Sequence, residues 1–216
     1  MSAMVPAERG GIRGSVDKGF RAGAEQALIR RPGSRAKMGR VICVAGMPGC
    51  GKEEFVKVAE ERGLPVVRMG DIVRQEARRR GIKFSDETVG GMAHEERVKH
   101  GFGVWAERTI PHVKEGATII DGIRGREEVE VFRRAFGDRL VVVAIHASPR
   151  TRYERIMKRG RGDDVLSRQE FHRREERELG WGLAEVIATA DHMIVNEEGL
   201  EALRAHSGKV LDAVAS

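Results

Sequence analysis

The segment at residues 46–53 constrains the fold of this chain more than any other feature. It reads Gly-Met-Pro-Gly-Cys-Gly-Lys-Glu, follows an apolar run at 41–45 and precedes a stretch with helical periodicity. Its glycines and Lys52 match the G-x-x-x-x-G-K pattern, in which consecutive backbone N–H groups converge on phosphate oxygens and the lysine reaches the β- and γ-phosphates. The positive end of the following helix faces the same anion. The segment therefore predicts binding of ATP, or a similar nucleoside triphosphate, by Gly46, Met47, Pro48, Gly49, Cys50, Gly51, Lys52 and Glu53.

The last residue of this loop departs from the usual pattern. The residue after the lysine is normally Ser or Thr, whose hydroxyl binds Mg²⁺, but here it is Glu53. A carboxylate is a good ligand for a hard cation, and an acid also suits the first turn of a helix. Two interpretations therefore stand: Glu53 replaces the hydroxyl at Mg²⁺, directly or through a water, or it only stabilises the start of the helix.

The pattern after residue 39 alternates between strands and helices. Apolar runs of strand length occupy 41–45, 65–69, 118–120, 140–145 and 192–195, and charged helical stretches occupy 52–62, 71–80, 126–136, 150–159 and 198–214. Continuous β-branched runs are typical of strands that are buried on both faces. Their alternation with helices implies parallel strands joined by right-handed crossovers. The sequence thus predicts an α/β P-loop NTPase fold with a central five-stranded parallel sheet, helices on both faces and a small helical lid.

Residues 1–39 differ in composition from the rest of the chain and mark a boundary. They are rich in Gly, Ala and Arg, and eight basic residues against three acidic ones give them +5 of the net charge of +6. Three interpretations stand: a disordered tail, a mis-called start that would place the first residue at Met38, or an organelle-targeting peptide. Residues 40–216 form the predicted kinase-like domain, because this length suffices for one full core.

The composition of the remaining chain excludes several classes of protein. Its near-neutral charge gives little support for a nucleic-acid partner. No run approaches the roughly 20 apolar residues of a membrane-spanning helix. The two cysteines, Cys43 and Cys50, suggest neither a disulfide framework nor a zinc site. We therefore expect a cytoplasmic protein, and the oligomeric state stays open.

Charged residues recur just after successive predicted strands. Gly70-Asp71-x-x-Arg74 follows the second strand, Asp121-Gly122-x-Arg124 follows the third, and an arginine cluster at 155–161 lies in the helix after the fourth. Open α/β sheets bind ligands at the carboxyl ends of their strands. Arginines at this edge can hold phosphates and neutralise transition-state charge, and Asp121 is placed to hold Mg²⁺. A helix N-cap remains the alternative role for Asp71.

These motifs resemble those of nucleoside monophosphate kinases. The Gly70–Arg74 element is similar to the acceptor-phosphate site of adenylate kinase, while Asp121–Arg124 resembles a second element there with one residue fewer before the arginine. Residues 190–203 look like part of dephospho-coenzyme A kinase. Residues 40–212 resemble most closely an archaeal family of P-loop kinase-like proteins related to both. That family shares the Gly-Met-Pro-Gly loop, Asp-Gly-Ile-Arg, the His-Ala-Ser-Pro segment at 146–149 and the Glu-Leu-Gly-Trp-Gly segment at 178–182.

The resemblance implies a role for each matching residue. Lys52, Arg124 and Arg159 would act on the transferred phosphoryl group, and the predicted acceptor-binding residues are Asp71, Arg74, Asp121 and Arg155. Glu53 and Asp121 would be the metal ligands. Residues 158–182, with Arg161, would form a lid, and residues 85–116 would cap the acceptor pocket. Within the cap, His94, Arg97 and Arg108 could contact substrate, whereas Trp105 and Trp181 are interpreted as packing residues.

The sequence as a whole predicts an ATP- and Mg²⁺-dependent kinase for a small nucleotide-type acceptor, such as a nucleoside monophosphate. Positioning and charge neutralisation supply most of the catalysis in such a reaction. Two alternatives remain. One is transfer to a ribose hydroxyl, as in dephospho-coenzyme A kinase, for which Asp71 or Asp121 would be the candidate base. The other is an ATP-binding regulator or slow ATPase.

Overall fold

A computed structural model describes residues 39–159 and 167–215, which belong to one compact unit spanning residues 35–216. The predicted leader, apart from its last residue, and Arg161 therefore lie outside the described residues. Within the described parts, no helix is both long enough and apolar enough to cross a membrane.

Five parallel strands form the central sheet, in the spatial order β2-β3-β1-β4-β5. The strands are β1 (Val41–Ala45), β2 (Val66–Arg68), β3 (Thr118–Asp121), β4 (Leu140–His146) and β5 (His192–Val195). Each lies in or overlaps one of the five predicted runs, which confirms the predicted fold class. The second run is shorter as a strand than expected, because Met69 already begins the next helix.

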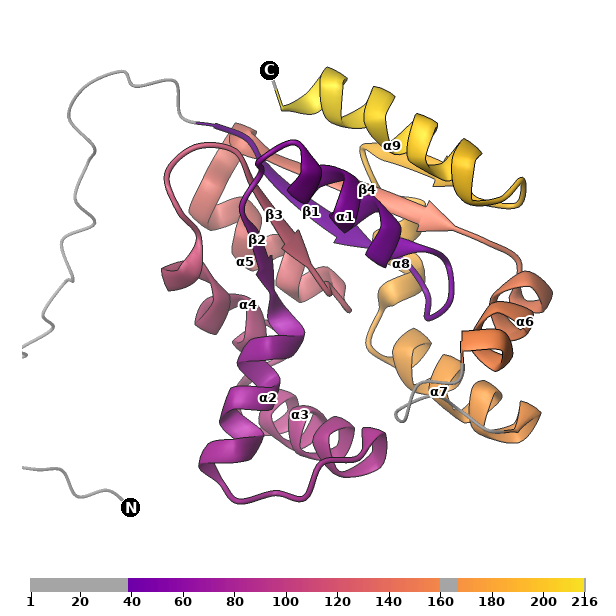
Figure 1. The fold of residues 1–216 in the computed structure, drawn as a ribbon. Coiled ribbons are helices and arrows are strands. Elements are labelled where there is room, and N and C mark those ends of the chain that lie inside the picture. The colour runs from indigo at the N-terminus through magenta and orange to yellow at the C-terminus, as the bar shows by residue number, and fades with distance from the viewer. Residues whose placement is uncertain (1–38, 160–166, 216) are drawn as a thin grey trace, which may run out of the picture. The chain divides into compact units, whose positions relative to one another are not determined.

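Helices cover both faces of the sheet (Figure 1). The predicted helical stretches correspond to α1 (Lys52–Glu61), α2 (Met69–Arg79), α5 (Arg126–Phe136), α6 (Pro149–Arg159) and α9 (Leu200–Val214). Four more helices lie in the predicted cap and lid or just after them: α3 (Asp86–His100), α4 (Val104–Thr109), α7 (Arg168–Gly180) and α8 (Leu183–Ala188). Short 3-10 turns occupy Ile110–His112 and Gly137–Arg139.

N-cap hydrogen bonds define where α3, in the predicted acceptor cap, and α7, in the predicted lid, begin. The Ser85 hydroxyl accepts a hydrogen bond from the Thr88 N–H at 3.1 Å, and the Ser85 N–H donates to the Thr88 hydroxyl at 3.1 Å, so α3 starts with a reciprocal capping box. The Ser167 hydroxyl accepts from the Glu170 N–H at 3.2 Å, so α7 starts with an N-cap hydrogen bond. These serines fix the helix starts although the apolar periodicity of both helices is weak.

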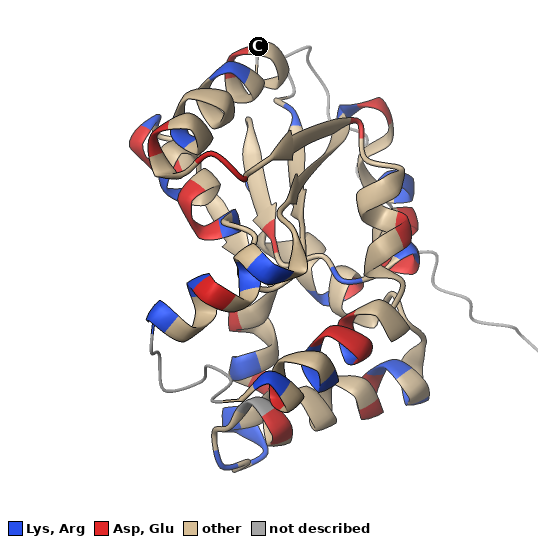
Figure 2. Cartoon of the chain, turned by 90° about the vertical axis from the view of Figure 1, so that its right-hand side faces the viewer, with Lys and Arg blue, Asp and Glu red and all other residues tan. Residues whose placement is uncertain are grey.

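The core consists of two apolar clusters, one on each face of the sheet. Alternate residues of β1 point in opposite directions, as the pleat of a strand requires. Ile42 and Val44 pack with Phe55 of α1 and the buried leucines of α9, whereas Cys43 packs on the other face with Trp105 of α4. The strands carry few charged residues, and most of the charged residues lie on the helices (Figure 2). The sheet is thus a rigid base whose carboxyl edge bears the polar groups.

The burial of Cys43 gives a test of this core. Its side chain is fully buried in the middle of β1, and desolvation, with a smaller contribution from the charge of Glu128, raises the pKa of the thiol well above its ordinary value. In a Cys50→Ser variant, Cys43 is the sole cysteine of the chain. We expect its alkylation rate in native buffer to follow the rate of global unfolding measured by hydrogen exchange. Alkylation at the rate of an exposed thiol would contradict the placement of β1.

Candidate nucleotide and acceptor sites

The phosphate-binding loop connects β1 to α1 in a conformation that requires its glycines. Gly46 and Gly51 have φ angles of 154° and 107°. A Cβ atom would lie 2.4 Å from the carbonyl oxygen of Ile145 at the first position, and 2.5 Å from the amide nitrogen of Asn196 at the second. Neither neighbour leaves room for a side chain, so both positions need glycine for its size as well as for its backbone freedom.

Lys52, the first residue of α1, folds back over this loop. Its Nζ donates to the carbonyl oxygen of Gly46 at 2.5 Å and lies 3.5 Å from that of Met47. The N–H of Cys50 closes the turn by donating to the Met47 carbonyl at 3.1 Å. The ammonium group therefore lies at the mouth of the loop, beside the start of a helix, where it can bind an anion.

Two buried side chains from distant parts of the chain hold the loop in place. Arg152 of α6 donates from Nη1 to the Pro48 carbonyl at 3.3 Å and from Nε to the Ala147 carbonyl at 2.9 Å, and it forms an ion pair with Glu175 of α7. Asn196, which follows β5, donates from Nδ2 to the Cys50 carbonyl at 2.8 Å. The loop is therefore braced on two sides by groups that the sequence analysis did not assign to the site.

Asp121 ends β3 next to the strand that leads into the loop. Its Cα pairs with that of Val44 on one side and with that of Arg68 on the other. Its Oδ1 is buried and accepts no hydrogen bond from any of the described residues. Such an atom is well suited to bind a cation, as the sequence predicted for this aspartate.

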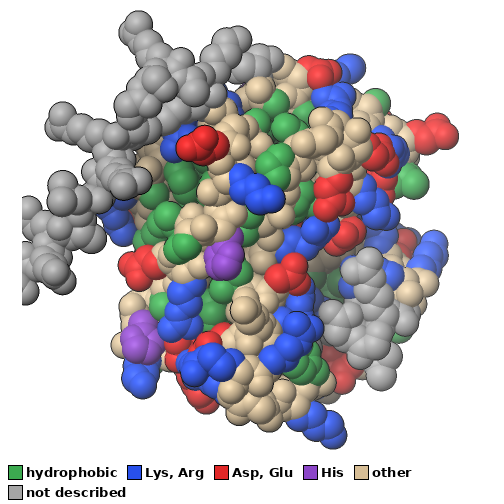
Figure 3. Space-filling view, turned by 60° about the vertical axis from the view of Figure 1, so that its left-hand side comes forward, with side chains coloured by type: hydrophobic (Ala, Val, Ile, Leu, Met, Phe, Trp, Pro, Cys, Tyr) green, Lys and Arg blue, Asp and Glu red, His purple; other side chains and the backbone are tan. Residues whose placement is uncertain are grey.

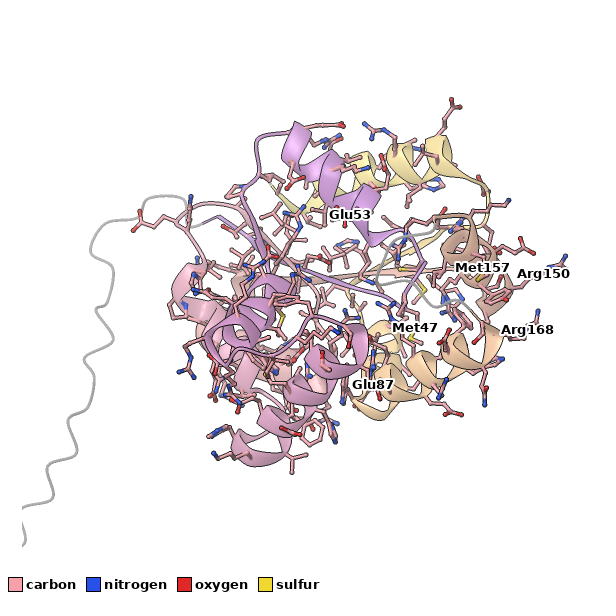
Figure 4. The ribbon with its side chains drawn as sticks, turned by 60° about the horizontal axis from the view of Figure 1, so that its bottom comes forward. Met47, Glu53, Glu87, Arg150, Met157 and Arg168 are labelled. Carbon is pink, nitrogen blue, oxygen red and sulfur yellow. The ribbon has the colours of Figure 1, made fainter. Side chains whose placement is uncertain are left out.

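Glu53 points from α1 toward the end of β2. Its Oε1 lies 3.9 Å from Nη2 of Arg68, and the Glu53 side chain is 48% exposed. Figure 4 labels Glu53 at the start of α1 and shows Arg150 pointing outward from α6, away from the loop. The structure thus places both predicted metal ligands, Glu53 and Asp121, beside one arginine.

These two carboxylates do not form a complete metal site by themselves. No group of three or more His, Cys, Asp or Glu side chains within residues 39–159 and 167–215 could hold a metal ion. Mg²⁺ usually takes one or two carboxylates and completes its shell with phosphate oxygens and waters. The unpartnered Oδ1 of Asp121 fits this type of site.

A pocket of about 370 Å³ lies between α2, α3 and α7, on the same edge of the sheet. Five arginines and three large aromatic residues contribute to its wall. The lining residues are Met69, Gly70, Val73, Arg74, Phe84, Ser85, Val89, Gly90, Ala93, Arg97, Trp105, Gly122, Arg124, Arg174, Arg177, Glu178 and Trp181. The pocket therefore combines a strong positive charge with apolar surface.

Two of the predicted arginines, the acceptor-binding Arg74 and the catalytic Arg124, line this pocket, each with an acidic partner. Arg74 forms an ion pair with Asp71 at 2.5 Å on the exposed side of α2. Arg124 donates from Nη1 to Oε2 of the buried Glu178 at 2.8 Å. Burial alone would lower the pKa of Arg124, but the charges of Glu178, Asp121 and Glu128 outweigh it and raise that pKa overall. Arg124 is therefore charged, and a carboxylate orients each of the two guanidinium groups.

Trp181 joins the cap helix α3 to the end of α7. Its indole N–H donates to Nδ1 of His94 at 3.2 Å, and the guanidinium carbon of Arg97 lies 4.4 Å from the ring centroid. Arg97 is itself fixed by an ion pair at 2.9 Å with Glu128, which is fully buried. Burial raises the pKa of Glu128, an effect that Arg97 and the Arg124 N–H oppose. Trp181 is thus a packing residue, as expected, and also part of the pocket wall.

The remaining predicted residues lie outside this pocket. Arg155 donates from Nη2 to Oδ1 of Asn196 at 3.3 Å, which places it beside the phosphate-binding loop. Arg159 is exposed at the end of α6. Arg108 pairs with Glu96 and covers the ring of Trp105 from its outer side. The structure therefore brings together Arg74, Arg97 and Arg124 from the predicted set, with Arg174, Arg177 and Glu178 as additions from α7.

Comparison with known proteins shows the family to which the chain belongs. A family model described as AAA domain, AAA_17, matches residues 45–172. A UPF0200 protein of Thermoplasma volcanium is 46% identical over 172 residues, which cover 79% of this chain and 96% of that protein. A UPF0200 protein of Methanopyrus kandleri is 53% identical over 163 residues, covering 73% and 81% of the two chains.

Solved structures of small-molecule kinases share the fold at low sequence identity. A gluconokinase from Sinorhizobium meliloti matches with a TM-score of 0.52 and 16% identity, covering 82% of this chain and 94% of that one. A shikimate kinase from Bacteroides thetaiotaomicron matches with a TM-score of 0.53 and 14% identity, covering 81% and 98%. The chain belongs to the archaeal UPF0200 family, which has a P-loop kinase-like fold, and the resemblance seen in the sequence is confirmed.

The bracing role of Asn196 can be tested by its replacement with alanine. Loss of its hydrogen bond leaves the Cys50 carbonyl without this partner, so the free energy of unfolding should fall by about 1–2 kcal/mol and the Kd of ATP should rise several-fold. Ser207→Ala is the matched control, because it removes a buried hydrogen bond to the Leu203 carbonyl within α9. Equal effects of the two variants on ATP affinity in calorimetric titrations would contradict the bracing role.

Proposed function

We propose that this member of the UPF0200 family is a kinase that transfers the γ-phosphoryl group of ATP, with Mg²⁺, to the phosphate of a small nucleotide-type acceptor. The observation that carries the proposal is the position of the arginine-lined pocket at the same sheet edge as the phosphate-binding loop. Asp121 stands beside the strand that enters the loop, and Gly122 and Arg124, one and three residues later, already line the pocket. Donor and acceptor sites that share one short segment suit direct transfer between two ligands.

The charge of the pocket supports an anionic acceptor. Among the described residues that line it are five arginines but one carboxylate, Glu178. Guanidinium groups bind phosphate oxygens in pairs and hold the acceptor in one orientation. The aromatic and aliphatic lining, including Phe84 and Trp105, can contact a base or another planar group. A phosphate-bearing acceptor with an apolar ring fits both properties.

The charged side chains that line the pocket also favour a phosphate over a hydroxyl as the nucleophile of the acceptor. A hydroxyl acceptor requires a base to remove its proton, whereas the oxygen of a phosphate is already ionised. Glu178 is tied to Arg124 at 2.8 Å and is 2% exposed, so it is poorly placed to act as that base. Of the two candidate bases named from the sequence, Asp71 is paired with Arg74 and Asp121 is assigned to Mg²⁺ in this proposal. The gluconokinase and shikimate kinase named above share the fold, but their likeness supports no particular acceptor for this chain.

Each predicted residue has a place in the proposed reaction. Lys52 binds the β- and γ-phosphates, Arg124 lies between donor and acceptor, and Arg74 binds the acceptor phosphate. Asp121 would hold Mg²⁺, with Glu53 directly or through water, and the bound ion would neutralise charge on the phosphates. Arg155, which the sequence analysis predicted to bind the acceptor, contacts Asn196 beside the phosphate-binding loop, so in this proposal it belongs with Arg159 to the donor side of the lid. Residues 160–166 of the predicted lid lie outside the described residues; closing of its described part, residues 167–182, over the cap at 85–116 would exclude water and favour transfer over hydrolysis.

The proposed acceptor is a small molecule, and the proposal does not include binding of a nucleic acid. On the face shown in Figure 3, basic and acidic side chains are interspersed. The grouping of arginines is local to the pocket, whose volume of about 370 Å³ suits a small molecule.

Product analysis tests the proposed reaction. ATP and Mg²⁺ are incubated with the full chain and with a nucleoside monophosphate, with dephospho-coenzyme A, or with no acceptor. We expect a nucleoside diphosphate together with one ADP for each phosphoryl group transferred. Phosphorylation of dephospho-coenzyme A instead would support the hydroxyl alternative, and slow ADP release that no acceptor changes would identify an ATPase.

The role of Arg74 predicts a selective kinetic effect. Arg74→Ala should raise the KM of the acceptor by about 10- to 100-fold, because a charge-assisted bidentate contact is lost, while the KM of ATP changes little. Arg79→Ala is a closely matched control: it lies on the same helix, pairs with an acid three residues before it and does not line the pocket. Equal effects of the two substitutions would contradict the assignment of Arg74.

The two proposed metal ligands predict different degrees of Mg²⁺ dependence. Asp121→Asn should raise the Mg²⁺ concentration for half-maximal turnover by about 10-fold or more, since it removes one charged ligand of a hard cation. Glu53→Ala should raise that concentration as well, but less, because its side chain is half-exposed and shared with Arg68. An unchanged Mg²⁺ dependence in Glu53→Ala would show that Glu53 only stabilises the start of α1.

A further inference from the structure

Arg68, the last residue of β2, lies among three carboxylates at the edge of the phosphate-binding site. Its Nη2 contacts Oε1 of Glu60 at 2.9 Å and lies 3.9 Å from Oε1 of Glu53. Its Cα pairs with that of Asp121 across the sheet. The proposed reaction assigns a task to Glu53 and Asp121 but none to the arginine beside them.

The contacts of Arg68 explain how an acidic residue is tolerated after the lysine of the loop. Glu53 places a negative charge near the position where a triphosphate would bind, and in most loops of this type the residue is an uncharged Ser or Thr. Arg68 supplies a positive charge on the same side of α1. Partial burial would lower the pKa of Arg68, but the hydrogen bond to Glu60 and the charges of Glu60, Glu53 and Asp121 outweigh it. The guanidinium is therefore a permanent cation.

The other face of α1 shows that this arrangement is specific to the side of Glu53. Glu54, the next residue, points away and forms an ion pair with Arg204 of α9, which also contacts Glu61 at 2.5 Å. Arg204 has no Cα pairing with Asp121, whereas Arg68 does. Of the two arginines that bridge glutamates on α1, Arg68 is the one whose Cα partner is a proposed metal ligand.

We propose that Arg68 is a built-in counter-charge for the phosphate-binding loop, which offsets Glu53 and Asp121 and so lets a nucleoside triphosphate bind before Mg²⁺. This inference rests on the proposed binding of ATP. It makes Arg68 a positioning and electrostatic residue rather than a catalytic one. When Mg²⁺ arrives with its own two positive charges, the contribution of Arg68 to the charge balance becomes smaller.

The test measures the Kd of ATP by calorimetric titration of the full chain, in EDTA and in excess Mg²⁺, at low salt. Arg68→Gln keeps much of the side-chain length and removes the charge, so the metal-free Kd should rise about 3- to 10-fold. Glu53→Gln should lower it, and the double variant should return to within about twofold of the wild type, because the two charges cancel. In excess Mg²⁺ the shift caused by Arg68→Gln should be smaller.

Two further variants separate charge from folding. Arg68→Lys keeps the charge and should retain the metal-free affinity of the wild type. Arg62→Ala removes a similarly exposed arginine at the far end of α1, where it pairs with Asp212 at 2.5 Å, and should leave the affinity unchanged. Thermal unfolding confirms that each variant is folded.

The outcomes distinguish this inference from the proposed function. If the wild type binds ATP but Arg68→Gln leaves the metal-free Kd within twofold, or if Glu53→Gln does not offset the loss, Arg68 is no counter-charge. If the wild type does not bind ATP in either condition, the proposed kinase function fails and this inference fails with it.

Discussion

The parallel pairing of β1 with β3 and β4 is the constraint on which the rest of the structure depends. It aligns Val44 with Asp121 and Ala45 with Ala144. The phosphate-binding loop and the proposed metal ligand Asp121 therefore lie at the same carboxyl edge of the sheet, and so does α6, whose Arg152 braces the loop. The three central strands, β1, β3 and β4, are buried on both faces by apolar side chains, so a shift of register by one residue would exchange those faces. The positions of the polar groups are therefore fixed by the packing of residues that do no chemistry.

Buried carboxylates orient the arginines around the two sites. Glu128 holds Arg97, Glu178 holds Arg124 and Glu175 holds Arg152. Burying such pairs contributes little net stability, since desolvation offsets much of their attraction. Their effect is to fix the guanidinium groups before a ligand binds, so that little reorganisation is needed during phosphoryl transfer. Each pair also joins two elements: Arg97 and Glu128 link α3 to α5, Arg124 and Glu178 link the turn after β3 to α7, and Arg152 and Glu175 link α6 to α7.

The sequence predicted the parts of the site that depend on local patterns. The glycines and Lys52 of the loop, and the arginines three residues after Asp71 and Asp121, follow from motifs next to apolar strands. The wall that α7 contributes could not be predicted, because its orientation depends on the contact of Trp181 with His94, 87 residues earlier in the chain. Arg68 was missed because it looks like an ordinary end of a strand until β2 is paired with β3.

The central claim is that donor and acceptor bind side by side, and a bisubstrate compound tests it most directly. The compound joins two adenosines through five phosphates and so spans both sites at once. Once one half is bound, binding of the second half is intramolecular, so the affinity of the whole compound should exceed that of ATP by about 100-fold. Most of this gain should be lost in Arg74→Ala. An affinity no higher than that of ATP, equal in the wild type and in Arg74→Ala, would contradict the placement of the acceptor beside the loop.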